Sequence, residues 1–185
     1  MSPTTGIDFA RLSLQDAFDL AILIEEEARE RYEEFADQME VHHTPEAARF
    51  FRFMAANEEK HRGALTARRR ERFGDAPAAV TRAMLFDVEA PDYDEARAFM
   101  TARAALGAAL RAESKAHAFF VAMLLQLHDP DVRTLFEELR NEEIEHEQLV
   151  RRELAKVPPD PQLAADDLCR RARRPLTAED CPCRH

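Results

Sequence analysis

The stretch FRFMAANEEKHRGAL, residues 51–65, decides the fold of this chain. Its apolar residues recur at steps of three and four, which is typical of the inward face of a helix. Two positions on that face are not apolar, because Glu58 and His61 stand between Met54 and Leu65. Residues three apart lie on the same side of a helix, so both polar side chains are predicted to point inward together.

Three other segments of the chain show the same apolar stripe, again interrupted by acids. In the first segment the stripe is Leu14, Phe18, Ala21, Glu25, Ala28, Tyr32, Phe35 and Met39. Later segments carry Leu106, Leu110, Glu113, His117, Phe120, Leu124 and Leu127, and then Val132, Leu139, Glu143, His146 and Val150. An unpaired carboxylate inside a core costs several kcal/mol, so these acids are expected to be protonated, hydrogen-bonded or bound to a cation.

The two halves of the chain repeat one another. The pattern Glu-x-x-Ala-x-x-x-aromatic begins at Glu25 and again at Glu113. A Glu-x-x-His pair follows in each half, beginning at Glu58 and at Glu143. Chance could place one such pair in a Glu-rich chain. Two pairs in register with an internal repeat indicate a common site.

Capping residues and prolines divide the chain into four helical segments. Ser13 followed by Asp16 resembles a capping box, and Thr44 and Asp129 each precede a proline at the first helical position. The expected helices run from Ser13 to Glu40, from Thr44 to Gly74, from about Pro91 to His128, and from Asp129 to the residues before Pro158.

The connections predict how these segments pack. Short turns join the first segment to the second and the third to the fourth, so each pair should form an antiparallel hairpin. The longer stretch between them, residues 74–90, is enough chain to cross the bundle from one end to the other. The sequence therefore predicts an all-α, ferritin-like four-helix bundle of two antiparallel hairpins with one long crossover. The bundle is expected over residues 10–156, followed by a flexible Pro/Arg/Cys-containing tail over residues 157–185.

Composition limits the classes of partner and the compartment. The chain has 185 residues and a formal net charge of -10, which argues against nucleic acid as a partner. Its three cysteines all follow residue 168, as expected in a reducing compartment. The N-terminus does not resemble a signal peptide, and the longest apolar run, Ala118 to Leu125, is too short to cross a membrane. We expect a cytoplasmic protein that contacts no membrane.

The six inward polar residues form a recognisable ligand set. Four carboxylates and two imidazoles suit two Fe ions, with Mn possible, because these metals prefer hard oxygen ligands with some nitrogen. Glu58 and Glu143 are expected to bridge the metals, and Glu25 and Glu113 to be terminal ligands. His61 and His146 would each bind one metal. The predicted metal ligands, which would act in catalysis through the metals, are therefore Glu25, Glu58, His61, Glu113, Glu143 and His146.

These residues resemble those of the rubrerythrin family, within the ferritin-like di-iron superfamily. The resemblance rests on Glu25-x-x-Ala28-x-x-x-Tyr32, Glu58-x-x-His61, Glu113 and Glu143-x-x-His146. It implies a di-iron oxidoreductase that reduces hydrogen peroxide or oxidises Fe(II), in oxidative-stress defence or iron homeostasis.

The chain departs from the family pattern in two ways. It has no Cys-x-x-Cys pair, so it lacks the rubredoxin domain that rubrerythrins carry. Ala116 stands where they have a further glutamate. In both respects a plain six-ligand site is closer to the ferroxidase centres of bacterioferritins and to manganese catalases.

Several expectations about partners and alternatives accompany this interpretation. The small substrate would be hydrogen peroxide, dioxygen or Fe(II), with an external electron donor, and the resemblance implies a homodimer. Tyr32, beside the ligands, is expected to be a core residue that can also hydrogen-bond a ligand. The alternatives are an iron-storage subunit of the ferritin type, a manganese catalase-like enzyme or an oxygenase on the same ligands, and a non-catalytic helical interaction module.

Overall fold

The computed structural model describes residues 7–41, 44–84 and 101–159, and within these ranges it contains helices and no strand. In chain order its elements are the 3-10 helix η1 (Phe9–Arg11), α1 (Leu14–Val41), α2 (Pro45–Phe73), the 3-10 helix η2 (Arg82–Met84), α3 (Ala102–Leu124) and α4 (Pro130–Leu154). The predicted all-α bundle of four long helices is confirmed. The predicted tail lies outside the described residues from position 160 onward.

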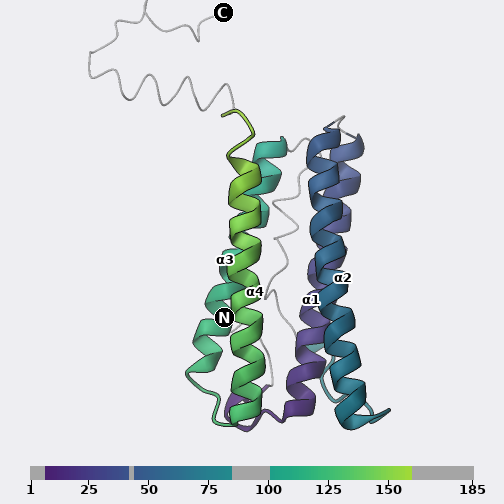
Figure 1. Ribbon diagram of the computed structural model, residues 1–185, viewed down its shortest axis with the longest axis vertical. Coiled ribbons are helices and arrows are strands. Elements are labelled where there is room, and N and C mark those ends of the chain that lie inside the picture. The colour runs from purple at the N-terminus through teal and green to yellow at the C-terminus, as the bar shows by residue number, and fades with distance from the viewer. Residues whose placement is uncertain (1–6, 42–43, 85–100, 160–185) are drawn as a thin grey trace, which may run out of the picture.

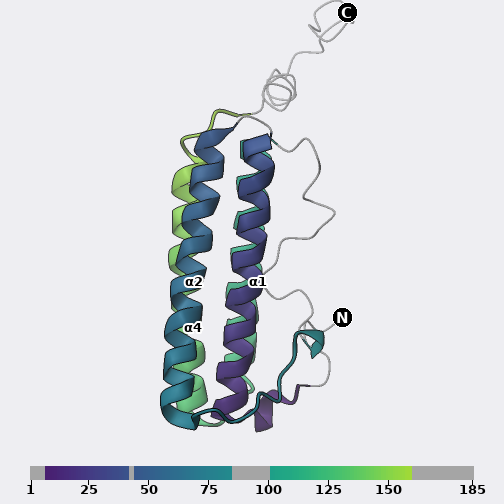
Figure 2. The same ribbon diagram turned by 90° about the vertical axis from the view of Figure 1, so that its right-hand side faces the viewer.

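The four helices form two antiparallel hairpins that stand side by side (Figures 1 and 2). α1 packs along α2, and α3 packs along α4. In Figure 1, α2 ends at the bottom of the bundle and α3 begins at the top. The chain between these helices therefore joins opposite ends of the bundle, as the predicted long crossover requires. None of the described helices is long and apolar enough to cross a membrane.

Local capping explains where α1 and α4 begin. The Ser13 Oγ accepts a hydrogen bond from the Asp16 backbone N–H at 3.1 Å, and the Ser13 hydroxyl donates to the Asp16 carboxylate at 2.6 Å. At the start of α4, the Asp129 carboxylate accepts from the N–H groups of Asp131 and Val132, at 2.9 and 3.0 Å. Both caps satisfy backbone donors that a helix end leaves without partners, so both predicted starts are confirmed.

Thr44 does not cap α2 in the predicted way. Its side chain makes no capping hydrogen bond to α2. The Thr44 hydroxyl donates instead to the carbonyl of Met39 at 2.9 Å, and the Thr44 N–H donates to the same carbonyl. The residue thus closes the tight turn after α1, and the fixed φ of Pro45 starts α2 without a side-chain cap.

The bounds of α3 differ from the prediction at both ends. Its N-cap is Thr101, whose side chain accepts from the Ala104 N–H at 3.1 Å, so α3 begins at Ala102; the predicted start at Pro91 lies outside the described residues. At the other end, α3 stops at Leu124 and not at His128. The Arg133 guanidinium of α4 donates to the carbonyls of Leu124 and Leu127, at 2.6 and 3.2 Å. This contact satisfies carbonyls that a longer helix would have bonded internally.

Most of the predicted stripe is buried, but four of its positions are only half-buried, namely Leu14, His61, Leu110 and His117. On α3 the buried face is wider than the predicted stripe, because small alanines such as Ala112 and Ala116 also face inward. Alanines let neighbouring helices approach α3 closely on this side. His117 therefore lies at the edge of the buried face and not at its centre.

The apolar interior consists of two clusters separated along the bundle axis. One cluster contains Phe18, Phe120 and Phe136, near the end where α1 and α4 begin. The other contains Phe35 and Phe51 with neighbours from all four helices, near the opposite end. On every helix, the acids of the stripe fall between the residues of one cluster and those of the other. The bundle therefore has a polar layer between two apolar layers.

Candidate metal centre

The structure brings the six predicted ligands together in the polar layer. α1 contributes Glu25, α3 contributes Glu113, and α2 and α4 each contribute a Glu-x-x-His pair, so the full set is Glu25, Glu58, His61, Glu113, Glu143 and His146. Together with Glu142, these residues form three groups in which all ligand atoms lie within 4.8 Å of one another. The four glutamates and His146 are buried, and only His61 is half-buried.

The inner position is the group formed by Glu113, Glu143 and His146, which are all buried. The Nδ1 atom of His146 lies 3.5 Å from Glu113 Oε2 and 3.4 Å from Glu58 Oε1. The His146 side chain is only 5% exposed. An ion in this position would have protein ligands on several sides and little contact with water.

The outer position is the group formed by Glu25, His61 and Glu142. The Nδ1 atom of His61 lies 3.9 Å from Glu25 Oε2 and 3.8 Å from Glu142 Oε2. The side chain of His61 is 27% exposed and that of Glu142 is 38% exposed, whereas Glu25 is buried. The outer position therefore borders solvent on the side where α2 faces α4.

Glu58 connects the two positions. Its carboxylate shares a group with both imidazoles, His61 and His146. The two rings are stacked, with centroids 5.2 Å apart and planes inclined by 6°. A carboxylate within reach of both imidazoles could contact an ion in either position, and the bridging role of Glu58 stays a prediction.

Buried polar atoms without hydrogen-bond partners test whether the site fits metal ions. Within the described part of the chain, Glu25 Oε2, both oxygens of Glu113 and the Nδ1 atoms of His61 and His146 have no such partner. Leaving these groups unsatisfied is costly, whereas a cation would satisfy them together. Carboxylate oxygens and imidazole nitrogens are ligands that Fe and Mn both accept, so the donor set fits a pair of such ions without distinguishing the two metals.

Glu142 is a candidate ligand that the sequence analysis missed. It precedes Glu143 on α4 and so lies beside the apolar stripe, not on it. The available signal in the sequence is the spacing of four residues between Glu142 and His146, which is common in any Glu-rich helix. The contact that distinguishes Glu142 is with His61 on another helix, and no local pattern predicts that contact.

Tyr32 occupies the apolar layer adjacent to the ligands. It is 2% exposed, and its ring stacks on Phe51 with centroids 6.1 Å apart. Among the described residues, its hydroxyl has no hydrogen-bond partner. Its predicted place in the core is therefore confirmed, while the predicted hydrogen bond from Tyr32 to a ligand stays a prediction.

Burial and neighbouring charges shift the pKa of several groups in the polar layer. Burial, together with the carboxylates of Glu142 and Glu113, raises the pKa of Glu25 from 4.5 to about 8. Burial and the nearby His146 lower the pKa of His61 from 6.5 to about 4, so His61 is neutral at pH 7 with a lone pair for a metal. Burial alone would lower the pKa of His146, but Glu113, Glu25 and Glu142 raise it overall. Burial raises the pKa of Glu142.

These shifts predict how the stability of the chelator-treated protein depends on pH. Glu25 and His146 have a raised pKa in the folded state, so folding binds their protons more tightly and the unfolding free energy falls as pH rises. The lowered pKa of His61 acts in the opposite direction, but only between pH 4 and 6.5. We therefore expect urea unfolding of the chelated protein to show falling stability from pH 6.5 to 8.

The variant Glu25→Gln is the control for this prediction, because its amide does not titrate. The decline between pH 6.5 and 8 should become shallower in this variant. An equally steep decline in the variant and the parent protein would show that Glu25 is already ionised in the folded chain.

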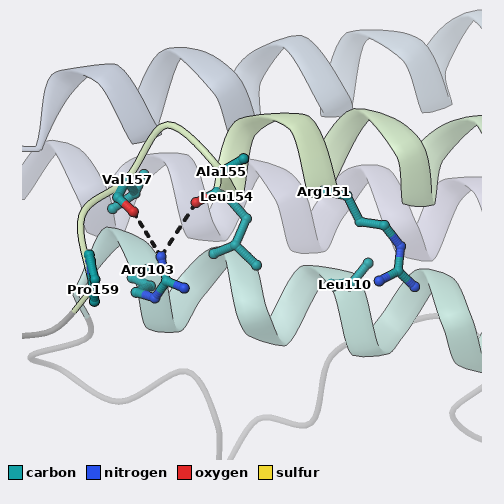
Figure 3. Close-up of a pocket in the computed structure, with 7 residues that line it drawn as sticks. All are labelled: Arg103, Leu110, Arg151, Leu154, Ala155, Val157 and Pro159. Atoms are coloured by element: carbon teal, nitrogen blue, oxygen red, sulfur yellow. Dashed lines mark hydrogen bonds between the residues drawn. The ribbon is translucent and has the colours of Figure 1, made fainter. Parts of the chain in front are cut away.

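A separate pocket lies at the end of the α3–α4 hairpin (Figure 3). It has a volume of about 530 Å³ and is lined by Arg103, Leu110, Arg151, Leu154, Ala155, Val157 and Pro159. The Arg103 guanidinium donates to the carbonyls of Leu154 and Val157, at 3.4 and 2.8 Å. None of the six ligands lines this pocket, so it is distinct from the polar layer.

Comparison with known proteins gives a family match for the first half of the chain. Residues 16–96 match the sequence model of the rubrerythrin family. This range includes Glu25, Glu58 and His61 but ends before Glu113, Glu143 and His146. A comparison with curated proteins gave no match.

Two solved structures extend the similarity over the whole bundle. An uncharacterised conserved protein from Magnetospirillum magnetotacticum MS-1 is 27% identical with a TM-score of 0.67, over 80% of this chain and 97% of that one. A hypothetical protein from Pyrococcus furiosus is 21% identical with a TM-score of 0.53, over 81% of this chain and 95% of that one, and it shows the fold alone. By sequence, residues 16–96 thus contain a rubrerythrin family domain, and the whole bundle is similar in fold to these two solved structures.

Proposed function

We propose that the chain binds two iron ions in the polar layer and acts as an oxidoreductase, reducing hydrogen peroxide or oxidising Fe(II). The observation that carries this proposal is the set of three overlapping Glu/His groups at one level of a closed bundle. Among the described residues, buried oxygens of Glu25 and Glu113 have no hydrogen-bond partner. Bound cations would offset the cost of burying these oxygens.

The charge of the ligand set is matched to a metal pair. Four carboxylates, from Glu25, Glu58, Glu113 and Glu143, neutralise two divalent cations, so a filled layer is near neutral inside the apolar interior. When bound, two Fe(II) ions supply two electrons, enough to convert hydrogen peroxide and two protons to two waters, or dioxygen and two protons to hydrogen peroxide. Mn(II) suits the same ligands.

The surrounding residues limit what reaches the ligands. Phe18 and Phe120 on one side of the layer, and Phe51 and Met54 on the other, are at most 1% exposed. These side chains exclude bulk water from the inner position. The half-buried His61 leaves an approach for a small oxidant or a metal ion from solvent. This arrangement supports a small inorganic substrate in preference to an organic one.

A spectroscopic experiment tests the proposal. The protein is loaded with Fe(II) without air, its iron content is measured, and its ultraviolet–visible spectrum is followed after mixing with hydrogen peroxide or with dioxygen. We expect two Fe(II) ions per chain and oxidation of both. Faster oxidation by peroxide would identify a peroxidase, and faster oxidation by dioxygen with turnover of added Fe(II) would identify a ferroxidase.

The contrary result is equally clear. A protein that binds neither Fe(II) nor Mn(II), and whose unfolding is unchanged by chelation, would have no metal centre. The helical interaction module would then be the better description of this chain.

A further inference from the structure

The six-ligand set leaves the two metal positions unequal. The inner position has two buried glutamates and a buried histidine, with Glu58 close to the same histidine. In the outer position Glu25 and His61 come from the six-ligand set, and the third member is Glu142. Glu25 Oε2, which points into this group, is buried and has no hydrogen-bond partner among the described residues. A cation in the outer position would satisfy this oxygen, and Glu142 lies beside it.

The distances suit shared coordination. Two atoms that bind one ion at about 2.1 Å lie roughly 3.0 to 4.2 Å apart, depending on the angle between them. The Nδ1 atom of His61 lies 3.8 Å from Glu142 Oε2 and 3.9 Å from Glu25 Oε2. Both separations fall inside that range, and the ligand atoms of all three side chains lie within 4.8 Å of one another, so small side-chain movements would bring all three onto one ion.

Glu142 forms no ion pair with Lys or Arg, among the described residues, that would compete with a metal ion for its carboxylate. In the described ranges, its only neighbour within ion-pair distance is His61, which is neutral at pH 7. Arg68, which faces α4 from α2, binds Glu138 instead, at 2.7 Å. The neighbouring surface acid Glu147 is paired with Arg151 at 2.8 Å. Among the described residues Glu142 thus has no Lys or Arg within ion-pair distance, whereas Glu138 and Glu147 on the same helix do.

We propose that Glu142 is a seventh ligand, which binds the outer metal ion together with Glu25 and His61 from the solvent side of the bundle. The inference rests on the metal pair proposed above. Because Glu142 is 38% exposed, it can contact an ion that is still partly hydrated and pass it to the buried Glu25. The outer ion is therefore the one that exchanges with solution, and the inner ion is the one that stays bound.

Titration with Co(II), a redox-stable ion with visible absorption bands, tests this inference. The parent protein should bind two Co(II) ions per chain. In Glu142→Gln the outer ion should bind about 10-fold more weakly or worse, with altered visible bands, while the inner ion keeps its affinity. Glu145→Gln is the matched control, because Glu145 is an exposed acid on the same helix and outside all three groups. It should bind both ions as the parent does.

The outcomes separate the two proposals. If the parent protein binds no Co(II), the metal centre itself is wrong. If the parent binds two ions and Glu142→Gln binds both with the same affinity and visible bands, only the role of Glu142 is wrong. Circular dichroism and thermal unfolding of the chelated variant check that it is folded, and the partial exposure of Glu142 makes a folded variant the expected result.

Discussion

Glu58→Ala should lose both metal ions, with affinities at least about 100-fold weaker than in the parent protein. Glu58 is fully buried, and among the described residues it alone shares a group with both His61 and His146. Its removal takes away the one carboxylate that is grouped with both imidazoles, so both positions lose a ligand atom together. Elemental analysis of the purified variant and anaerobic Fe(II) titration measure the loss.

The control for this experiment is Glu59→Ala. Glu59 is the next residue of α2, but its side chain is 49% exposed and bonds Arg62 at 2.7 Å. This variant should bind two ions like the parent. Full iron occupancy in Glu58→Ala would show that the metals, if present, lie elsewhere in the chain.

Glu113→Leu should separate the function of a buried carboxylate from its effect on folding. Glu113 has no exposed surface, and neither of its oxygens has a hydrogen-bond partner among the described residues. Removing an unsatisfied buried polar group is expected to stabilise the chelated protein by about 1 to 3 kcal/mol, less the loss of the Glu113 contact that raises the pKa of His146. The same change removes a ligand from the inner position, so the variant should bind at most one ion tightly. Urea unfolding with and without chelator measures both effects.

Glu113→Gln is the companion variant. Its amide removes the charge but keeps a buried polar group, so its gain in stability should be smaller than that of the leucine variant. If Glu113→Leu were instead less stable than the parent under chelation, the carboxylate would be a structural element of the bundle and not primarily a metal ligand.

The results expected for Glu58→Ala and Glu113→Leu have one physical cause. The proposed ligands are costly to bury when no ion is bound. Four carboxylates and His146 lie between two apolar layers. Metal binding to the folded chain then contributes directly to its stability, because the unfolded chain has no assembled site. Chelation should therefore lower the stability of the parent protein while leaving Glu58→Ala unaffected.

The sequence predicted those features that depend on neighbouring residues. The starts of α1 and α4 are set by Ser13 and Asp129, whose side chains bond backbone groups two or three positions away. The helical period likewise places Glu58 and His61 on one face without reference to any other helix. Each of the four helices has such a face with polar residues on it. When the four faces pack together, these polar residues can be buried only against one another. The six residues were therefore predictable as one cluster.

The tertiary structure decided those features that depend on how the helices are placed relative to one another. Arg133 of α4 ends α3 at Leu124, and the turn carbonyl of Met39 takes the hydroxyl of Thr44 away from α2. Glu142 becomes part of the outer position only because α4 is rotated to bring its flank within 3.8 Å of His61 on α2. Periodicity gives the face of each helix, whereas rotation and translation of the helices come from packing of the whole interior. The sequence thus determined the two inward-facing Glu-x-x-His pairs, and packing determined which side of the site opens to solvent.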